Sequence, residues 1–116
     1  MLPRLVCLLL SAGVIGCGSL HFENLPEPSR EQLQQLVDRH ARQTEVTAEL
    51  GPAFTLYAKG TDSWRILEGS LERVPAEVRP LIPKYPKVVL YTTSYQYTWL
   101  FFDETDELKA FRIGSQ

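Results

Sequence analysis

The sequence predicts an α+β domain of two layers, with one or two N-terminal helices packed on a three- to four-stranded antiparallel sheet. Apolar residues recur at helical spacing in the first half of the chain, and short β-favouring runs fill the second half. A chain of 116 residues has room for one core. In a two-layer arrangement, the apolar stripe of the helices and one face of the sheet bury each other.

Composition narrows the class of protein further. Hydrophobic residues make up 44% of the chain and charged residues 22%, which argues against a disordered chain and against a protein with several membrane spans. The formal net charge is -2, so the chain has no excess of cations to attract a phosphate backbone. We therefore expect no nucleic acid partner.

The start of the chain has the features of an export signal. Arg4 provides a positive charge, residues 5–12 form an apolar run, and Gly16 stands directly before Cys17. The run is shorter than the roughly 20 apolar residues that span a bilayer. The pattern resembles a bacterial lipobox, which implies cleavage before Cys17 and attachment of lipid to that cysteine. Cleavage near the small residues 11–13, as in an ordinary secreted protein, is the alternative.

Lipid on Cys17 would make the membrane a partner of this protein. Cys7 lies in the segment to be removed, so we expect no structural disulfide. The predicted organisation is a lipoprotein signal peptide at residues 1–16, the lipidated cysteine and a flexible tether at 17–28, and a periplasmic domain at 29–116. Gly18 and Ser19 resemble the residues that direct enterobacterial lipoproteins to the outer membrane.

The helical region is predicted to begin at Ser29, which can cap free amides together with Gln32 three residues later. Gly51 and Pro52 end it, because glycine provides a C-terminal cap and proline cannot continue a helix. Its apolar stripe consists of Leu33, Leu36, Val37, His40 and Ala41. The pattern leaves open whether this region is one helix or two that join near residues 40–44.

Short runs rich in β-branched and aromatic residues predict the strands, at residues 54–58, 64–67, 87–93, 97–102 and 108–113. Turn-like residues separate the first two runs, and the polar residues 103–107 connect the last two. Residues 69–86 contain four prolines, which remove hydrogen-bond donors and predict a long irregular loop.

Two short motifs carry a family resemblance. Residues 45–51 read Glu-Val-Thr-Ala-Glu-Leu-Gly, and residues 102–108 read Phe-Asp-Glu-Thr-Asp-Glu-Leu. Together with the lipobox they resemble the SmpA/OmlA (BamE-like) family of small outer-membrane lipoproteins. Pro52 comes one place early, and Asp106 takes the place of a glycine, where aspartate tolerates the left-handed conformation. The resemblance implies an α+β fold and a role in outer-membrane protein assembly.

The sequence gives little support for catalysis or metal binding. Its only histidines are His21, in the tether, and His40, which we expect to pack on the apolar stripe. Asp103, Asp106 and Glu107 crowd one turn, but they lack calcium-loop spacing and are predicted to be solvated. We therefore expect a protein that is not an enzyme and has no catalytic residue, cofactor or metal.

The aromatic residues of the strand at 97–102 provide the candidate partner site. Odd positions from 95 to 101 are all aromatic, and period-two alternation places them on one face of the sheet. The N-terminal helices can cover only one face of the sheet. The aromatic face is then covered either by the Pro-rich loop or by a partner protein. If a partner binds there, we expect Tyr95, Tyr97 and Trp99 to contact it.

Two functions follow from these observations. The first is a non-enzymatic lipoprotein on the periplasmic side of the outer membrane, acting as a scaffold or accessory subunit of an envelope protein complex. Outer-membrane protein assembly is the process that the resemblance implies. The alternative is a periplasm-facing binding module that captures a small ligand, or inhibits a secreted enzyme, through a cleft under the Pro-rich loop.

Overall fold

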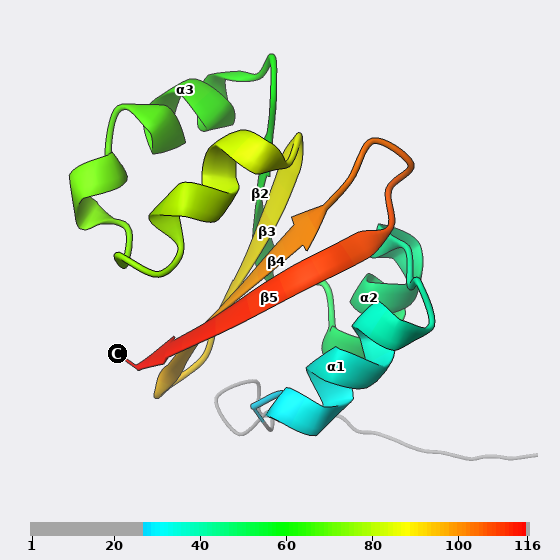
Figure 1. Ribbon diagram of the computed structural model, residues 1–116. Helices are drawn as coiled ribbons and strands as arrows, with labels where there is room; N and C mark the ends of the chain where they lie inside the picture. Colours follow the sequence, from blue (N-terminus) through cyan, green and yellow to red (C-terminus); the bar gives the residue numbers. More distant parts are fainter. Residues whose placement is uncertain (1–26, 116) are drawn as a thin grey trace, which may run out of the picture.

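The computed structural model describes residues 27–115, which form an α+β domain (Figure 1). The helices α1 (Arg30–Asp38) and α2 (Gln43–Leu50) come first. The sheet consists of β2 (Phe54–Ala58), β3 (Lys87–Thr92), β4 (Gln96–Phe102) and β5 (Leu108–Ser115). Between β2 and β3 lie α3 (Asp62–Glu68) and two 3-10 helices, η3 (Leu71–Arg73) and η4 (Arg79–Lys84). The predicted class, the N-terminal helices and the antiparallel sheet are confirmed.

The N-terminal helical region is two helices, which settles the alternative that the sequence left open. Ser29 Oγ accepts a hydrogen bond from the Gln32 amide at 3.1 Å, so the predicted N-cap is confirmed. At the other end of α1, His40 has a φ of +56°, and its amide donates to the carbonyl of Val37. The Ala41 amide donates to the carbonyl of Leu36. This left-handed ending stops the helix although the apolar pattern continues.

His40 is exposed, so the prediction that it packs on the apolar stripe was wrong. Its side chain is 65% exposed, and its Nδ1 lies 3.6 Å from Oε1 of Glu107. The physical reason is that α1 ends at Asp38, so helical spacing no longer places residue 40 above Leu36. Ala41, which is fully buried, takes the core position instead.

Glu49 joins the two helices. Its oxygens accept hydrogen bonds from Gln32 Nε2 at 2.9 Å and from the Arg39 guanidinium at 2.7 Å. These two bonds lower the pKa of Glu49 below its ordinary value. One residue after the end of α2, Gly51 adopts a φ of +103° that favours glycine, as the sequence predicted for this stop.

Residues 64–67 lie in α3, so the strand predicted there was wrong. Thr61 Oγ1 accepts a hydrogen bond from the Trp64 amide at 3.3 Å and caps a helix that begins at Asp62. Trp64 and Leu67, three residues apart, are both buried. A run of four residues is too short to distinguish a period of two from a period of 3.6. The cap in the preceding turn therefore decides the structure.

The Pro-rich residues 69–86, predicted as an irregular loop, contain the two short 3-10 helices. Prolines prevent a continuous α-helix or a central strand here, while short 3-10 turns need few amide donors. Arg79 fixes the turn between η3 and η4, because its Nε donates to the Val74 carbonyl at 2.8 Å. We call residues 62–84, which comprise α3, η3 and η4, the covering segment.

The sheet has the strand order β2-β3-β4-β5, and each neighbouring pair is antiparallel. Val88 pairs with Phe101 and Leu90 pairs with Trp99, so these side chains share one face. The alternation predicted for β4 is confirmed. The turn into β5 contains Asp106, whose φ of +69° is the left-handed conformation predicted for it.

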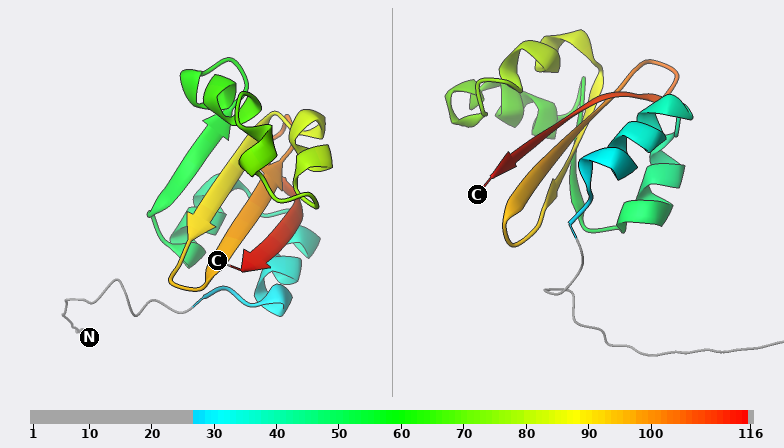
Figure 2. Two further views of the ribbon diagram at one scale, coloured as in Figure 1. Left: turned by 90° about the vertical axis from the view of Figure 1, so that its left-hand side faces the viewer. Right: turned by 60° about the horizontal axis from the view of Figure 1, so that its bottom comes forward.

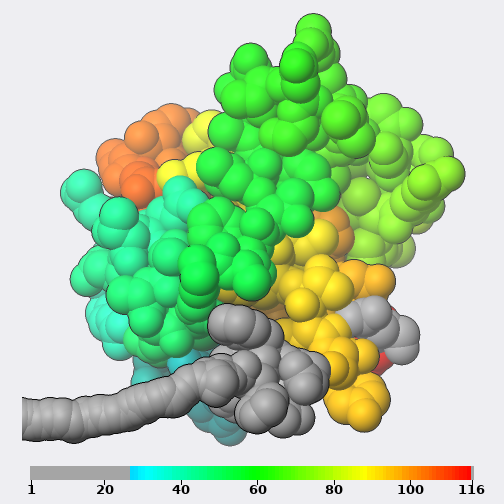
Figure 3. Space-filling model, turned by 180° about the vertical axis from the view of Figure 1, so that it is seen from behind, coloured from blue at the N-terminus to red at the C-terminus, as the bar shows by residue number. Residues whose placement is uncertain are grey.

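Helices cover both faces of this sheet (Figure 2). On one face, α1 and α2 form a core with Leu33, Leu36, Ala41, Val46, Val89, Tyr91, Leu100, Phe102, Leu108 and Phe111. On the other, the covering segment forms a second core with Trp64, Leu67, Val74, Val78, Ile82, Val88, Trp99 and Phe101. Figure 3 shows the helical pair and the covering segment on different sides of the molecule. Among the described residues, the members of both cores lie between positions 33 and 113, so a chain that begins at Gly18 contains all of them.

Candidate functional site

The predicted lipid attachment site, Cys17, lies outside the described residues, as do the expected signal peptide and most of the expected tether. Within residues 27–115, none of the helices has the length and apolar character needed to cross a membrane. Glu27 and Pro28, the last residues of the expected tether, are bound to the turn between β3 and β4. The Glu27 carboxylate accepts from the Tyr95 amide at 3.0 Å, and the Pro28 carbonyl accepts from Gln96 Nε2 at 3.1 Å.

The three residues predicted to contact a partner differ in exposure. Tyr95 lies in the β3–β4 turn and is 79% exposed. Tyr97 is half-buried in β4, and Trp99, two residues further along the strand, is only 6% exposed. The covering segment packs against Trp99, so the three rings do not form one open patch.

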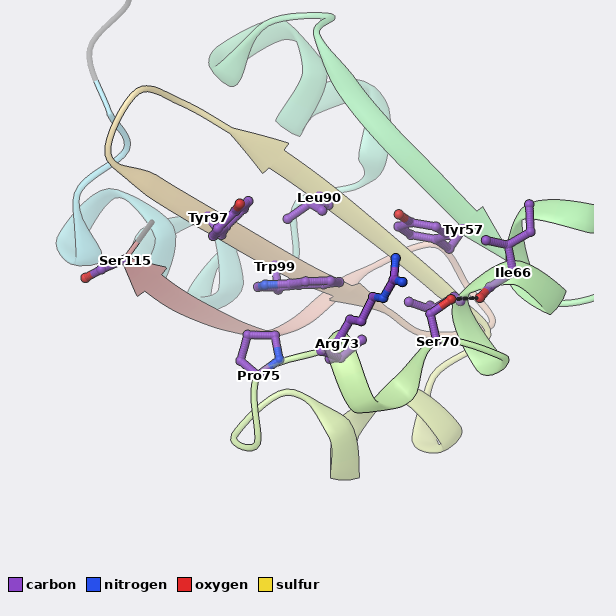
Figure 4. A pocket seen from close by; sticks show the side chains of 11 residues that line it. Tyr57, Ile66, Ser70, Arg73, Pro75, Leu90, Tyr97, Trp99 and Ser115 are labelled. Atoms are coloured by element: carbon purple, nitrogen blue, oxygen red, sulfur yellow. Dashed lines mark hydrogen bonds between the residues drawn. The ribbon is translucent and has the colours of Figure 1, made fainter.

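A cavity of about 320 Å³ lies between the sheet and the covering segment (Figure 4). Its walls come from β2, β3, β4 and the end of β5 on one side, and from α3, η3 and the residues that follow each of them on the other. The lining residues are Tyr57, Ile66, Leu67, Ser70, Arg73, Val74, Pro75, Leu90, Tyr97, Trp99 and Ser115. Two of the three predicted residues, Tyr97 and Trp99, therefore meet in this cavity.

Local hydrogen bonds hold the covering segment over the cavity. The Ser70 hydroxyl donates to the Ile66 carbonyl at 2.6 Å and fixes the turn after α3. Arg79 donates to the carbonyls of Val74 and Glu72, at 2.8 and 3.3 Å. The accepting carbonyls lie near the end of α3, in η3 and directly after η3, so these bonds fix the position of the wall that faces Trp99.

Two hydrogen-bond donors in the cavity lack acceptors among the described residues. Trp99 Nε1 is buried and has no hydrogen-bond partner. Arg73 is the single charged residue of the lining, and its guanidinium makes no hydrogen bond or ion pair within residues 27–115, although its backbone amide donates to the Ser70 carbonyl at 2.9 Å. Figure 4 shows its guanidinium pointing away from η3 toward the strands. An indole N–H and a guanidinium can only donate, so both groups need acceptors that the described residues do not provide. The Arg73 guanidinium is exposed, whereas Trp99 Nε1 is buried.

Arg73, Tyr57 and Leu90 were missed by the sequence analysis. Tyr57 and Leu90 sit on strands that the sequence did predict, but their position opposite the covering segment depends on tertiary packing. Arg73 belongs to the stretch predicted as an irregular loop, where no periodic pattern assigns a direction to a side chain. Its unpaired charge is visible only in the folded chain.

The acidic turn is held by its own hydrogen bonds. Asp103 Oδ1 accepts from the Thr105 amide at 2.9 Å and from the Glu107 amide at 3.0 Å, and Asp106 forms an ion pair with Lys87. Bonds from Thr105 and Glu107 lower the pKa of Asp103. Among residues 27–115 there is no group of three or more histidine, cysteine, aspartate or glutamate residues that could hold a metal ion.

A second cavity, of about 640 Å³, lies beside α2, the end of β3 and the turn between β3 and β4. Glu27 and Pro28, the first two described residues, are part of its lining. The cavity under the covering segment is bounded by residues from 57 to 115 and is the better-defined candidate site.

Comparisons with known proteins do not assign this chain to a family. No protein-family model matches the chain, and neither does a curated protein or a solved structure. The resemblance to the SmpA/OmlA family stays a prediction from the two motifs and the lipobox.

Proposed function

We propose that this chain is a non-enzymatic bacterial envelope lipoprotein, tethered through Cys17, whose domain captures a small ligand. The observation that carries the binding role is the cavity of about 320 Å³ under the covering segment. Its volume is at the lower end of the range of ligand pockets, and its lining combines apolar walls with few polar groups, as such pockets do. The lipobox pattern before Cys17 supports export and anchoring.

The chemistry of the lining favours binding over catalysis. The lining contains no histidine, cysteine, aspartate or glutamate that could activate a nucleophile. The Ser70 hydroxyl already donates to the Ile66 carbonyl, and His40 belongs to the turn between α1 and α2 and is not part of the lining. A bound molecule would therefore be held without being converted.

The scaffold role predicted from the sequence has less support. A protein-docking surface would need its aromatic residues accessible together, yet Trp99 is covered and only Tyr95 is largely exposed. A small molecule, in contrast, can use Tyr97 and Trp99 inside the cavity. The proposed function is therefore the capture of a small ligand at the periplasmic face of the outer membrane.

The test uses the chain from Gly18 onward, which keeps both cores, and 2-naphthylmethanol as a neutral two-ring probe. Leu90 lines the cavity, so Leu90→Trp should fill part of it and weaken binding of the probe about tenfold, which corresponds to ~1.4 kcal/mol. The matched control is Leu56→Trp, because Leu56 lies on the neighbouring strand β2, outside the cavity.

Binding is followed by the rise in melting temperature with probe concentration and by the ¹H–¹⁵N resonance of the Trp99 indole. The proposal predicts that the Trp99 resonance shifts in the unmodified chain and in Leu56→Trp, and much less in Leu90→Trp. Absence of any shift at millimolar probe, or equal binding by both variants, would contradict the proposal.

A further inference from the structure

We propose that the ligand of this cavity is an organic anion with an apolar body. The inference rests on the proposed function and names the chemical class that the same site selects. Two donors of the lining have no acceptor among the described residues: Trp99 Nε1, which is buried, and the guanidinium of Arg73, which is exposed. A buried polar group without a partner costs free energy, so a ligand that supplies the missing partner gains affinity.

The first such group is Trp99 Nε1. The side chain is 6% exposed, and its indole nitrogen is buried without an acceptor among the described residues. In Figure 4 the nitrogen lies at the end of the ring nearer Tyr97 and Ser115. An indole N–H can only donate, so its partner must be an acceptor atom. A hydroxyl, carbonyl or carboxylate oxygen can each accept from it, so Trp99 requires an acceptor on the ligand and the choice of an anion rests on the second group.

The second group is Arg73. Other arginines of the covering segment are occupied, because Arg65 forms an ion pair with Asp62 and Arg79 donates to two carbonyls. Arg73 has no such partner within residues 27–115, and it is the one charged residue in the lining. A guanidinium binds a carboxylate through charge-assisted hydrogen bonds, which are stronger than neutral ones.

The remaining lining selects the body of the ligand. Leu67, Val74, Pro75 and Leu90 provide apolar contacts, and the rings of Tyr57 and Tyr97 add flat surfaces. No aspartate or glutamate of the described chain is part of the lining, so a cationic ligand would meet only Arg73 and its like charge. The cavity therefore matches a ligand with a negatively charged group and an apolar body, and it disfavours a ligand with a positively charged group.

The experiment compares two probes with the same two-ring body, naphthalene-2-carboxylate and 2-naphthylmethanol, on the chain from Gly18 onward. Because Arg73 is exposed at the cavity, its contact with the carboxylate is partly screened by water. We expect the carboxylate to bind about fivefold more tightly than the alcohol, within the range for partly exposed charge pairs. Dissociation constants come from the titration of the Trp99 indole resonance.

Two variants remove one positive charge each from the covering segment. Arg73→Gln should abolish the preference for the carboxylate, so that this variant binds the two probes with equal affinity. Arg65→Gln is the matched control, because Arg65 is exposed on α3 and lies outside the lining. This control should keep the preference, which separates a local contact from the effect of net charge.

The outcomes distinguish the two proposals. Equal affinity for the two probes, or a preference that survives Arg73→Gln, would overturn the anion inference while the cavity remained a ligand site. If neither probe shifts the Trp99 resonance, the proposed function fails as well. A preference that is lost in Arg73→Gln and kept in Arg65→Gln supports the inference.

Discussion

Among the described residues, His40 and Asp106 are the two non-glycine residues with positive backbone φ angles, +56° and +69°. This conformation costs roughly 1–2 kcal/mol for most side chains and less for aspartate. Asp106 gains an ion pair with Lys87, and its amide donates to the Asp103 carbonyl at 3.0 Å. His40 gains only a 3.6 Å approach to Glu107. The strain at His40 is therefore the less compensated of the two.

Replacing His40 with glycine should stabilise the domain. Glycine adopts positive φ without a steric penalty, although it loses more backbone entropy on folding, so we expect a gain of about 0.5–1 kcal/mol in the free energy of unfolding. Urea denaturation measures the change. His40→Ala is the control, because alanine keeps the steric penalty and loses the contact with Glu107. Equal stabilities of the two variants would show that backbone strain at this position is negligible.

At the scale of elements, Glu49 connects α1 to α2 through Gln32 and Arg39, at 2.9 and 2.7 Å. These bonds lower the pKa of Glu49 below its ordinary value of 4.5. A lowered pKa in the folded state means that the ionised carboxylate contributes stability above about pH 4.5. That contribution is lost as the pH falls through the lowered pKa.

We therefore expect Glu49→Gln to reduce the melting temperature at pH 7 and to lose less stability on acidification than the unmodified chain. The difference in melting temperature between Glu49→Gln and the unmodified chain should shrink as the pH falls below about 4.5. Thermal unfolding at a series of pH values measures it. Glu104→Gln, in the exposed β4–β5 turn, removes a carboxylate without breaking a bond between helices. A Glu49→Gln difference that stays constant down to pH 3 would contradict this account.

Elements with a strong local signal were predicted correctly from the sequence. Ser29 and Gly51 mark helix ends through their own backbone chemistry, and the alternation in β4 follows from strand geometry. The strand predicted at residues 64–67 was wrong because four residues carry no reliable period, and the Thr61 cap outweighed their β propensity. A helix end or a strand is therefore predictable from the sequence where a single residue type, such as a capping serine or a glycine, determines the backbone conformation.

The candidate site was predictable only in part. Tyr97 and Trp99 were identified because their alternation places them on the face opposite α1 and α2. Whether the Pro-rich stretch leaves a space beside them depends on how the covering segment packs. The free donors of Arg73 and Trp99 depend on which acceptors fold nearby. The space and the free donors both depend on contacts between residues distant in sequence, which a local sequence pattern does not predict.

At the scale of the whole molecule, the chain that leads into α1 is attached to one end of the sheet. Glu27 accepts a hydrogen bond from the Tyr95 amide at 3.0 Å, and Gln96 Nε2 donates to the Pro28 carbonyl at 3.1 Å. Both contacts lie at the β3–β4 turn, whereas the β4–β5 turn lies at the opposite end of β4 (Figure 2). The attachment therefore defines the end of the sheet at which Glu27 and Pro28 join the domain.

If Cys17 carries the proposed lipid, this attachment orients the domain on the membrane. Cys17 precedes Glu27 by ten positions, so the β3–β4 turn lies within about 35 Å of the anchor even with a fully extended chain. The seven residues of β4 add about 23 Å between the two turns. A donor dye at Ser94 should then transfer energy more efficiently to acceptor lipids than a donor at Glu104, in the lipidated protein bound to vesicles.

A single substitution can remove the contact between Glu27 and the Tyr95 amide. Glu27→Ala should narrow the difference in energy transfer between the Ser94 and Glu104 positions, because the tether then leaves the domain from a less fixed point. The melting temperature should change little, since Glu27 lies outside both apolar cores. Glu31→Ala, on the exposed side of α1, is the matched control and should keep the difference. Equal transfer from both positions in the unmodified protein would mean that the attachment does not set its orientation.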